Sequence, residues 1–391
     1  MLIPRLRSSS SICQIDVIQE GDSLGNNTIL LFKTSSGRSI HAIGVPQDFH
    51  SSLGPTWVYA VASERDGITL VDAGCRNSME ILIRALHKAG LTKNVIRRVF
   101  LTHSHSDHDG AAMRLAEYTG AELWAHELYK LLLPFSTGDI GGQANAFVLE
   151  TLRKHNRKKD PLDEPTELDV DDWLQSDKPH NEMRQQMTIH RALIDGERWS
   201  DFAFYSTPGH SPDELTIALD EILFTGDHIL PEITPLPTVK TSYPVSLKNN
   251  LPMRYQDPEL QYGLATYIRS LIRIARFGKG YTILPAHRLI SKGRINLITP
   301  HRANLIVHHH FHRMRRIMAF LGSVDRTVLE ITYQLFASRE LKGENLFLAV
   351  SEVIAHLEFM IDAADVEILP DRRIRWLGTN HCLKVLDSMI A

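Results

Sequence analysis

Short apolar runs alternate with helix-like segments along the first 130 residues. The apolar runs are rich in β-branched and aromatic residues and are bounded by Gly, Pro, Asn or Asp, which is typical of strands. Strands are expected at residues 27–32, 56–63, 67–74, 95–103 and 121–127, and amphipathic helices at 78–90 and 111–120. Both helices close with a glycine, Gly90 and Gly120. An order of strand, helix, strand, helix, strand predicts a layered α/β unit.

The pattern changes in the second third of the chain. Residues 130–190 are polar and rich in charge, so we expect an insertion or flap rather than part of the core. Regular structure resumes with strands at 202–210, 216–227 and 281–287, a tight turn at Asp220–Glu221 and a helix at 264–280. From about residue 295 the pattern is mostly helical. The 391 residues thus predict two domains, 1–295 and 296–391.

Composition and charge narrow the classes of function. A net charge of −3 gives no overall field that would attract nucleic acid. No apolar run approaches the roughly 20 residues that span a bilayer, and no apolar signal segment follows the N-terminus, so we expect a cytoplasmic protein without membrane contact. The three cysteines, Cys13, Cys75 and Cys382, are far apart, which favours neither a disulfide framework nor a thiolate zinc site. A metal here would be bound by histidine and carboxylate.

Histidines and aspartates stand at the C-terminal ends of the expected strands. The positions are Asp72, His103, His105, Asp107, His108, His210, Asp227 and His287. Four of them fall in one segment, LTHSHSDHDG, where His103 and His105 are two residues apart and point to the same face of an extended chain. Strand ends gather along one edge of a layered α/β protein, so these side chains are expected to meet there.

Imidazole and carboxylate are good ligands for zinc and other divalent ions. One ion would be held by His103, His105 and His210, and a second by Asp107, His108 and His287. Asp227 would bridge both ions, and Asp72 would accept a hydrogen bond from a ligand histidine. Two ions that share a water supply hydroxide near neutral pH. The carboxylates that would hold or orient this centre are Asp107, Asp227 and Asp72, and we expect them to be the catalytic ones. Zinc is the first choice of metal, with iron or manganese as alternatives.

The segment HSHSDH, residues 103–108, matches the H-x-H-x-D-H signature of the metallo-β-lactamase superfamily. VDAG, TPGHSPDE, FTGDHI and LPAH resemble its other motifs in the same order, so the resemblance covers about residues 28–290. It implies an αββα sandwich with a dinuclear metal centre that hydrolyses an ester, thioester, lactone, lactam or phosphodiester.

Within that superfamily the chain looks most similar to the hydroxyacylglutathione hydrolase-like group, often called glyoxalase II-like. The bridging Asp227 and the complete second set of ligands fit that group. LPAH departs from the common Pro-Gly-His-Gly: it keeps His287 but changes the loop, because Ala286 lacks the conformational freedom of glycine. The chain also lacks a clear match to the glutathione-binding Arg/Lys pattern, so another thioester, an ester or a lactone of a small acyl compound is the expected substrate.

The C-terminal part suggests a second functional class. Residues 325–337 and 344–361 each carry apolar residues on one helical face, and 366–378 is expected to form two short strands. Helix, helix, hairpin is the outline of a winged-helix module and resembles the C-terminal domain of a subfamily that includes an endoribonuclease. An endoribonuclease or phosphodiesterase is therefore the alternative function. However, residues 301–391 contain 11 Lys or Arg and 11 Asp or Glu, whereas nucleic-acid binding needs a local excess of positive charge.

Three residues outside the ligand set are expected to face the substrate: His228, Lys240 and Tyr243. The histidine-rich segment VHHHFHRMRR, residues 307–316, is a weaker candidate for a further metal site. His308 and His312 share a helical face, but the segment contains no acidic partner, which favours a partly exposed helix. A non-catalytic binding protein that has kept the fold is a further alternative, and the complete ligand set argues against it.

Overall fold

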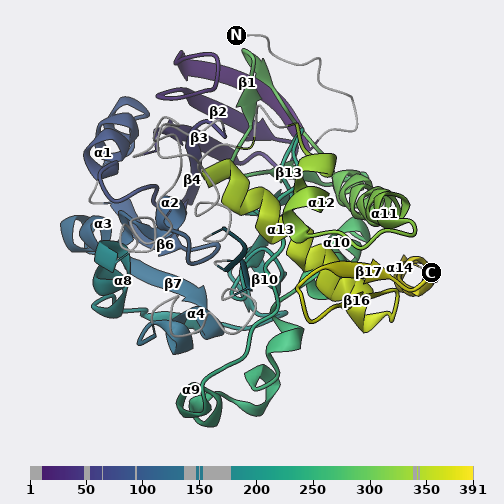
Figure 1. The fold of residues 1–391 in the computed structure, drawn as a ribbon. Coiled ribbons are helices and arrows are strands. Elements are labelled where there is room, and N and C mark those ends of the chain that lie inside the picture. The colour runs from purple at the N-terminus through teal and green to yellow at the C-terminus, as the bar shows by residue number, and fades with distance from the viewer. Residues whose placement is uncertain are drawn as a thin grey trace, which may run out of the picture. The chain divides into compact units, whose positions relative to one another are not determined.

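The computed structural model describes residues 11–47, 53–63, 65–92, 95–135, 147–148, 150–152, 178–337, 341 and 344–390 (Figure 1). The chain forms two compact units of three segments each. Unit 1 comprises Met1–Pro134, Glu182–Pro235 and Arg273–Asn304, and unit 2 comprises Phe135–Asn181, Leu236–Ile272 and Leu305–Ala391. The domain boundary expected between residues 295 and 296 stays a prediction. Most of the insertion expected at 130–190 lies outside the described residues.

The larger sheet of unit 1 has eight strands in sequential order. They are β1 (Ile12–Gln19), β2 (Ile29–Thr34), β3 (Ser39–Val45), β4 (Thr56–Ser63), β5 (Gly67–Val71), β6 (Ile96–Phe100), β7 (Glu122–His126) and β8 (Arg191–Leu193). Strands β1 to β5 pair antiparallel, and β5 to β8 pair parallel. Parallel neighbours need a crossover, which α1 (Met79–Lys88) supplies between β5 and β6 and α3 (Ala112–Thr119) supplies between β6 and β7.

The second sheet of unit 1 has five strands in the order β13-β12-β11-β10-β9. They are β9 (Arg198–Trp199), β10 (Phe202–Ser206), β11 (Leu215–Leu219), β12 (Ile222–Phe224) and β13 (Thr282–Leu284). Asp220, with a φ of 50°, and Glu221 form the tight turn between β11 and β12. A short hairpin of β14 (Ile290–Ser291) and β15 (Arg294–Ile295) follows β13.

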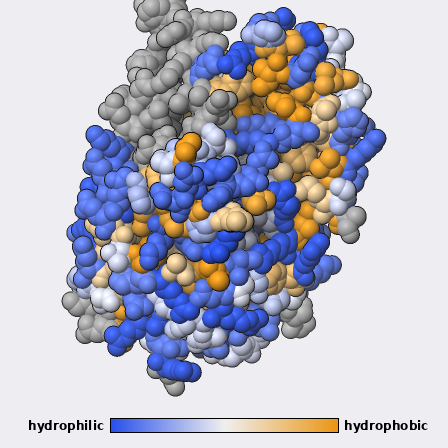
Figure 2. Space-filling model, turned by 90° about the horizontal axis from the view of Figure 1, so that it is seen from below, coloured by the Kyte–Doolittle hydropathy of each residue, from blue (hydrophilic) through white to orange (hydrophobic). Residues whose placement is uncertain are grey.

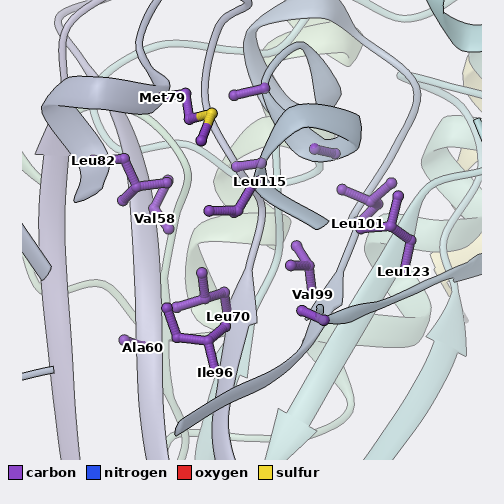
Figure 3. Packing of buried hydrophobic residues seen from close by; sticks show 14 of the residues in the cluster. Val58, Ala60, Leu70, Met79, Leu82, Ile96, Val99, Leu101, Leu115 and Leu123 are labelled. Atoms are coloured by element: carbon purple, nitrogen blue, oxygen red, sulfur yellow. The ribbon is translucent and has the colours of Figure 1, made fainter. Parts of the chain in front are cut away.

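Strand β4 explains how the two layers are held together, because it is buried on both faces. Its Val58 and Ala60 belong to a hydrophobic core shared with α1 and α3, where Figure 3 shows Val58 beside Leu82 of α1. The alternate residues face the second sheet; they are Trp57, Tyr59 and Val61. Successive side chains of a strand point to opposite faces, so one continuous apolar run supplies both cores. The predicted α/β sandwich class is confirmed.

Unit 2 is mostly helical. It contains α9 (Val245–Asn250), two short 3₁₀ helices η2 (Met253–Tyr255) and η3 (Pro258–Leu260), α12 (Val328–Leu335), α13 (Glu344–Asp362), β16 (Val366–Ile368), β17 (Ile374–Trp376) and α14 (His381–Ile390), with most of α10 (Leu264–Ala275) and α11 (His301–Leu321). Helix α12 begins at a capping box, in which Thr327 and Glu330 each bond the other's backbone N–H. The expected order of helix, helix and hairpin is present as α12, α13 and β16–β17. Its assignment as a winged helix stays a prediction.

The sequence pattern did not predict β1 and β3. Strand β3 contains His41 and Gly44, and β1 places polar residues among its apolar ones, so neither shows a continuous apolar run.

On the face drawn in Figure 2, most residues are hydrophilic and the hydrophobic ones gather toward the upper right. Among the described residues, no helix is long and apolar enough to cross a membrane.

Candidate metal centre

Seven of the expected ligands follow strands of unit 1. His103 and His105 follow β6, Asp107 and His108 lie on the short helix α2 (Ser106–Asp109), His210 follows β10, Asp227 follows β12 and His287 follows β13. The structure brings all seven together in overlapping groups of three whose ligand atoms lie within 4.8 Å of one another. We call these seven residues the strand-edge cluster.

Three imidazoles form the first set of the cluster. Nδ1 of His105 lies 2.9 Å from Nε2 of His103 and 3.2 Å from Nε2 of His210. Burial, followed by the neighbouring His210, lowers the pKa of His105 to about 3. Burial likewise lowers the pKa of His103. Both rings are therefore neutral at neutral pH and carry the lone pairs that a metal ion needs.

Asp107, His108 and His287 form the second set. Oδ2 of Asp107 lies 3.0 Å from Nε2 of His287 and 3.5 Å from Nε2 of His108. The side-chain amide of Gln47 donates to the same oxygen at 2.8 Å. Burial alone would raise the pKa of Asp107, but the adjacent His108 and His287 hold it below its usual value. The carboxylate is therefore ionised and directed at the two imidazoles.

Asp227 lies between the two sets. Its Oδ1 is 3.6 Å from Nε2 of His108 and 3.4 Å from Nε2 of His287, and its Oδ2 is 3.6 Å from Nε2 of His210. Burial opposes ionisation, but His287 and His108 hold the pKa of Asp227 below its usual value. One carboxylate thus presents a different oxygen to each set, which is the arrangement that a bridging ligand requires.

Asp72 lies behind the histidines and accepts three hydrogen bonds. Its Oδ2 accepts from Nδ1 of His108 and from Oγ1 of Thr102, both at 2.9 Å, and its Oδ1 accepts from the backbone N–H of Thr102 at 2.8 Å. Because the Thr102 hydroxyl donates to Asp72, it accepts from Nδ1 of His103, 3.0 Å away. These bonds direct Nε2 of both rings into the cluster.

The atoms that face into the cluster fit a divalent metal ion. Nδ1 of His287 donates to the carbonyl of Pro55 at 3.0 Å, which directs Nε2 into the cluster. Nε2 of His108, Nε2 of His287 and Oδ1 of Asp227 are all buried without a hydrogen-bond partner. Unpaired buried polar atoms cost free energy, and a cation between them would satisfy all three. Imidazole and carboxylate together are the donors that zinc and related ions prefer.

Sequence reasoning missed Glu214, which contacts the cluster from the protein interior. Its Oε1 accepts from the backbone N–H of Asp227 at 3.1 Å and lies 3.5 Å from Nδ1 of His103. The side chain is fully buried, and burial followed by the charge of Asp227 raises its pKa. The available signal was the acidic pair Asp213–Glu214 directly before β11, a strand that is buried along its whole length.

Asp109, the last acid of the histidine-rich segment, does not join the cluster. It is fully buried and accepts a hydrogen bond from the hydroxyl of Tyr129 at 2.7 Å. Nε of Arg184 lies 3.3 Å from the same oxygen, so the carboxylate is paired with a buried guanidinium. Tyr129 comes from α4 (Glu127–Leu132) and Arg184 from α8 (Lys178–Gln185). Asp109 therefore links α2 to Tyr129 and Arg184, and all three residues belong to unit 1.

None of the three expected substrate residues belongs to the strand-edge cluster. His228 is fully buried next to Asp227, so it has no exposed surface for a substrate. Lys240 and Tyr243 belong to unit 2. There, Nζ of Lys240 pairs with Asp362 at 2.5 Å, and the ring of Tyr243 packs on Tyr262. Substrate contact by these three residues stays a prediction.

Comparison with known proteins agrees with this geometry. Residues 52–287 match the family model described as the metallo-beta-lactamase superfamily. The solved structure of a metallo-β-lactamase family protein from Thermus thermophilus is 22% identical, with a TM-score of 0.60, and the match covers 86% of this chain and 98% of that chain. A β-lactamase domain protein from Burkholderia ambifaria is 20% identical, with a TM-score of 0.63, and the match covers 88% of this chain and 93% of that chain.

At these identities the two structures establish the fold alone. No curated protein matches the chain. The family match spans more than half of the chain and contains the whole strand-edge cluster. The chain belongs to the metallo-β-lactamase superfamily.

Proposed function

We propose that the protein is a metal-dependent hydrolase that cleaves a thioester, an ester or a lactone of a small acyl compound at the strand-edge cluster. The observation that carries the proposal is the position of Asp227, whose two oxygens face different sets of histidines. A complete set of donors for two ions supports catalysis over a purely structural metal. Members of this superfamily are hydrolases.

The proposed site would hold two divalent cations, with zinc as the first choice. His103, His105 and His210 would hold one, and Asp107, His108 and His287 the other, with Asp227 between them. Such a pair of cations, when bound, lowers the pKa of a shared water and supplies hydroxide near neutral pH.

In the proposal, side chains of the cluster would position the substrate and the attacking water, and Asp72 would orient a ligand ring. Asp107 and His210 retain 15% and 12% of their side-chain exposure, whereas His108 and His287 retain none, so the substrate would approach from the side of Asp107 and His210. Asp107 would also accept a hydrogen bond from the attacking water, because its carboxylate is ionised. Asp72 would hold the ring of His108 in one orientation.

The charges of unit 2 support a small-molecule substrate over RNA. The hairpin β16–β17 and its turn carry three arginines that could contact phosphate. Each is paired with a carboxylate: Arg372 with Glu150 at 3.4 Å, Arg373 with Asp371 at 2.7 Å, and Arg375 with Asp325 at 2.9 Å. An arginine that is already paired contributes less to phosphate binding, because its partner must first be displaced.

The proposal is tested by hydrolysis assays on the purified, metal-analysed protein. A panel of acyl thioesters, esters and lactones is compared with single-stranded RNA, at two salt concentrations. The variant His105→Ala removes a central ligand, and His308→Ala replaces an exposed histidine of α11 as the matched control. We expect acyl cleavage that His105→Ala abolishes, with its fold intact by circular dichroism, and that His308→Ala leaves unchanged.

Two other outcomes would overturn the proposal. Cleavage of RNA alone, dependent on His105 and strongly weakened by salt, would make the protein a nuclease. Retention of metal without turnover of any substrate class would make it a binding protein that has kept the fold.

A further inference from the structure

Among the residues that the structure describes, one group of potential metal ligands lies outside the strand-edge cluster. It consists of His310 on α11 and of Glu352 and His356 on α13, and its ligand atoms lie within 4.8 Å of one another. All three belong to unit 2, where both helices can be followed in Figure 1. We call this group the α11–α13 cluster. The sequence offered His310 without an acidic partner, and the structure supplies that partner from a different helix.

The nitrogens of the α11–α13 cluster are spaced like those of the strand-edge cluster. Nδ1 of His310 lies 3.0 Å from Nε2 of His356. The corresponding distance between ligand nitrogens of His103 and His105 is 2.9 Å. Two nitrogens bound to one ion at about 2.0–2.1 Å, with angles between about 90° and 110°, lie about 2.8–3.4 Å apart. The histidine pair therefore has the separation of two ligands of a single ion.

The ring of His356 is oriented as metal-binding histidines are. Its Nδ1 lies 2.6 Å from the backbone carbonyl of Glu352 and donates to it. This bond leaves a lone pair on Nε2, the nitrogen that faces His310. His287 of the strand-edge cluster has the same arrangement, with Nδ1 donating to the carbonyl of Pro55. A hydrogen bond of this kind fixes the tautomer and the ring orientation of a ligand histidine.

Glu352 completes the group and gives it access to solvent. It stands four residues before His356 on α13, so both side chains project from the same helical face. His310 and His356 are fully buried, whereas the side chain of Glu352 keeps 12% of its exposure. An ion could thus enter along the carboxylate and be held by two nitrogens and one oxygen, a donor set that zinc accepts with a water as fourth ligand.

We propose that His310, Glu352 and His356 form a second metal site, which binds one zinc or similar first-row divalent ion between α11 and α13. The site lies within unit 2 and shares no residue with the strand-edge cluster, so it goes beyond the proposed hydrolase function. Its ligands come from two helices, and the ion would therefore stabilise the packing of α11 on α13.

Arg313 offers the competing explanation of the same geometry. Its Nη1 lies 3.1 Å from Oε1 of Glu352, and its Nη2 donates to Nε2 of His309 at 2.8 Å. Without an ion, the group would be an Arg–Glu pair beside a His310–His356 hydrogen bond. A carboxylate has two oxygens, so Arg313 and an ion can both contact Glu352. The guanidinium charge would nevertheless make this site weaker than the strand-edge cluster.

Zinc binding to the full-length protein distinguishes the two explanations. The protein is stripped with a chelator, titrated with Zn²⁺, and analysed for zinc per chain by elemental analysis and for its melting temperature. His356→Gln and Glu352→Gln each remove one proposed ligand, and Glu352→Gln preserves the side-chain volume if the histidine variant fails to fold. His308→Gln, an exposed histidine on the same helix, is the matched control.

We expect both ligand variants to bind about one zinc ion fewer per chain than His308→Gln, or to bind the weakest ion at least tenfold less tightly. The same loss should appear when Asp227→Ala is present, because the two clusters are separate. Equal zinc content and an equal zinc-dependent rise in melting temperature in Glu352→Gln and His308→Gln would overturn the proposal. The result is independent of hydrolase activity, so failure of either proposal can be recognised by itself.

Discussion

Oδ2 of Asp72 lies 2.9 Å from Nδ1 of His108. Asp72 holds this position with a φ of 63°, in the left-handed region that aspartate and asparagine tolerate better than most residues. The same carboxylate accepts both the backbone N–H and the hydroxyl of Thr102. One buried side chain thus orients a ligand ring and also fixes the segment that leads to His103.

Replacing Asp72 with asparagine should weaken metal binding without removing a ligand. Asparagine suits the left-handed backbone, but it carries no charge to stabilise the N–H of His108. Loss of such a partner typically lowers metal affinity by about 10- to 100-fold. Competition with a chromophoric chelator measures the change. Asp387→Asn, at an exposed position of α14, serves as the control. An unchanged affinity in Asp72→Asn would show that the hydrogen bond to His108 has no part in metal binding.

Gly226→Ala should disturb the cluster through backbone geometry. Gly226 has a φ of 50°, and a Cβ there would lie 2.5 Å from Oε1 of Glu214 and 2.8 Å from Cβ of Thr102. The contacts would displace the oxygen that accepts from the backbone of Asp227. We expect a loss of stability of about 1–3 kcal/mol and a lower metal content.

Gly278→Ala is the matched control for that variant. Gly278 also has a positive φ, 81°, but a Cβ there would meet no atom within 4 Å. Gly278→Ala should lose only the stability that a positive φ costs an alanine, and it should keep the metal content of the unaltered protein. Thermal unfolding and elemental analysis of the two variants check the comparison. If both variants lost the same stability and the same metal content, the contacts with Glu214 and Thr102 would not be the cause of the loss.

Much of unit 1 was predictable because its strands carry local signals. Strand β4 is one continuous apolar run and was expected at the bounds that the structure shows. The ligand positions were also predictable from local sequence, because each histidine or aspartate follows an apolar run. The segment after β6 shows the limit of this reasoning. Asp107 and Asp109 lie in the same short segment, yet the first faces the histidines and the second pairs with Arg184. Hydrophobic periodicity does not separate them, and only the match to the H-x-H-x-D-H signature predicts Asp107 as the ligand.

The remaining parts depend on contacts between distant segments. Gln47 reaches Asp107 across 60 positions of sequence, and no local pattern marks it. The segment that contains His310 has no acidic residue, whereas Glu352 meets His310 from α13. Periodicity gives the face of a helix but does not give the residues that another helix places against that face. Such partners become visible only after the chain has folded.

Arg184→Met should destabilise unit 1 more than Tyr129→Phe does. Asp109 is fully buried and is contacted by both the guanidinium of Arg184 and the hydroxyl of Tyr129. Removing the arginine leaves an uncompensated buried charge, which costs about 3–5 kcal/mol. Removing the hydroxyl leaves the ion pair and costs about 1–2 kcal/mol. Urea unfolding of both variants measures the free energies. If the two losses were equal, Asp109 would not depend on Arg184 for its charge.

Glu358 of α13 should make the stability of the protein depend on pH. Burial raises its pKa from 4.5 to about 7, although the backbone N–H of Lys240 donates to its Oε2 at 2.8 Å and opposes the shift. The folded chain therefore keeps a proton that the unfolded chain releases. The resulting stabilisation is complete below about pH 4.5 and is lost as the pH rises through about 7, a change of about 3 kcal/mol. Glu358→Gln should remove this dependence, and Glu367→Gln, at an exposed position of β16, should keep it. Urea unfolding at about pH 5 and about pH 7.5 compares the three proteins; a slope in Glu358→Gln as steep as in the unaltered chain would assign the pH dependence to other groups.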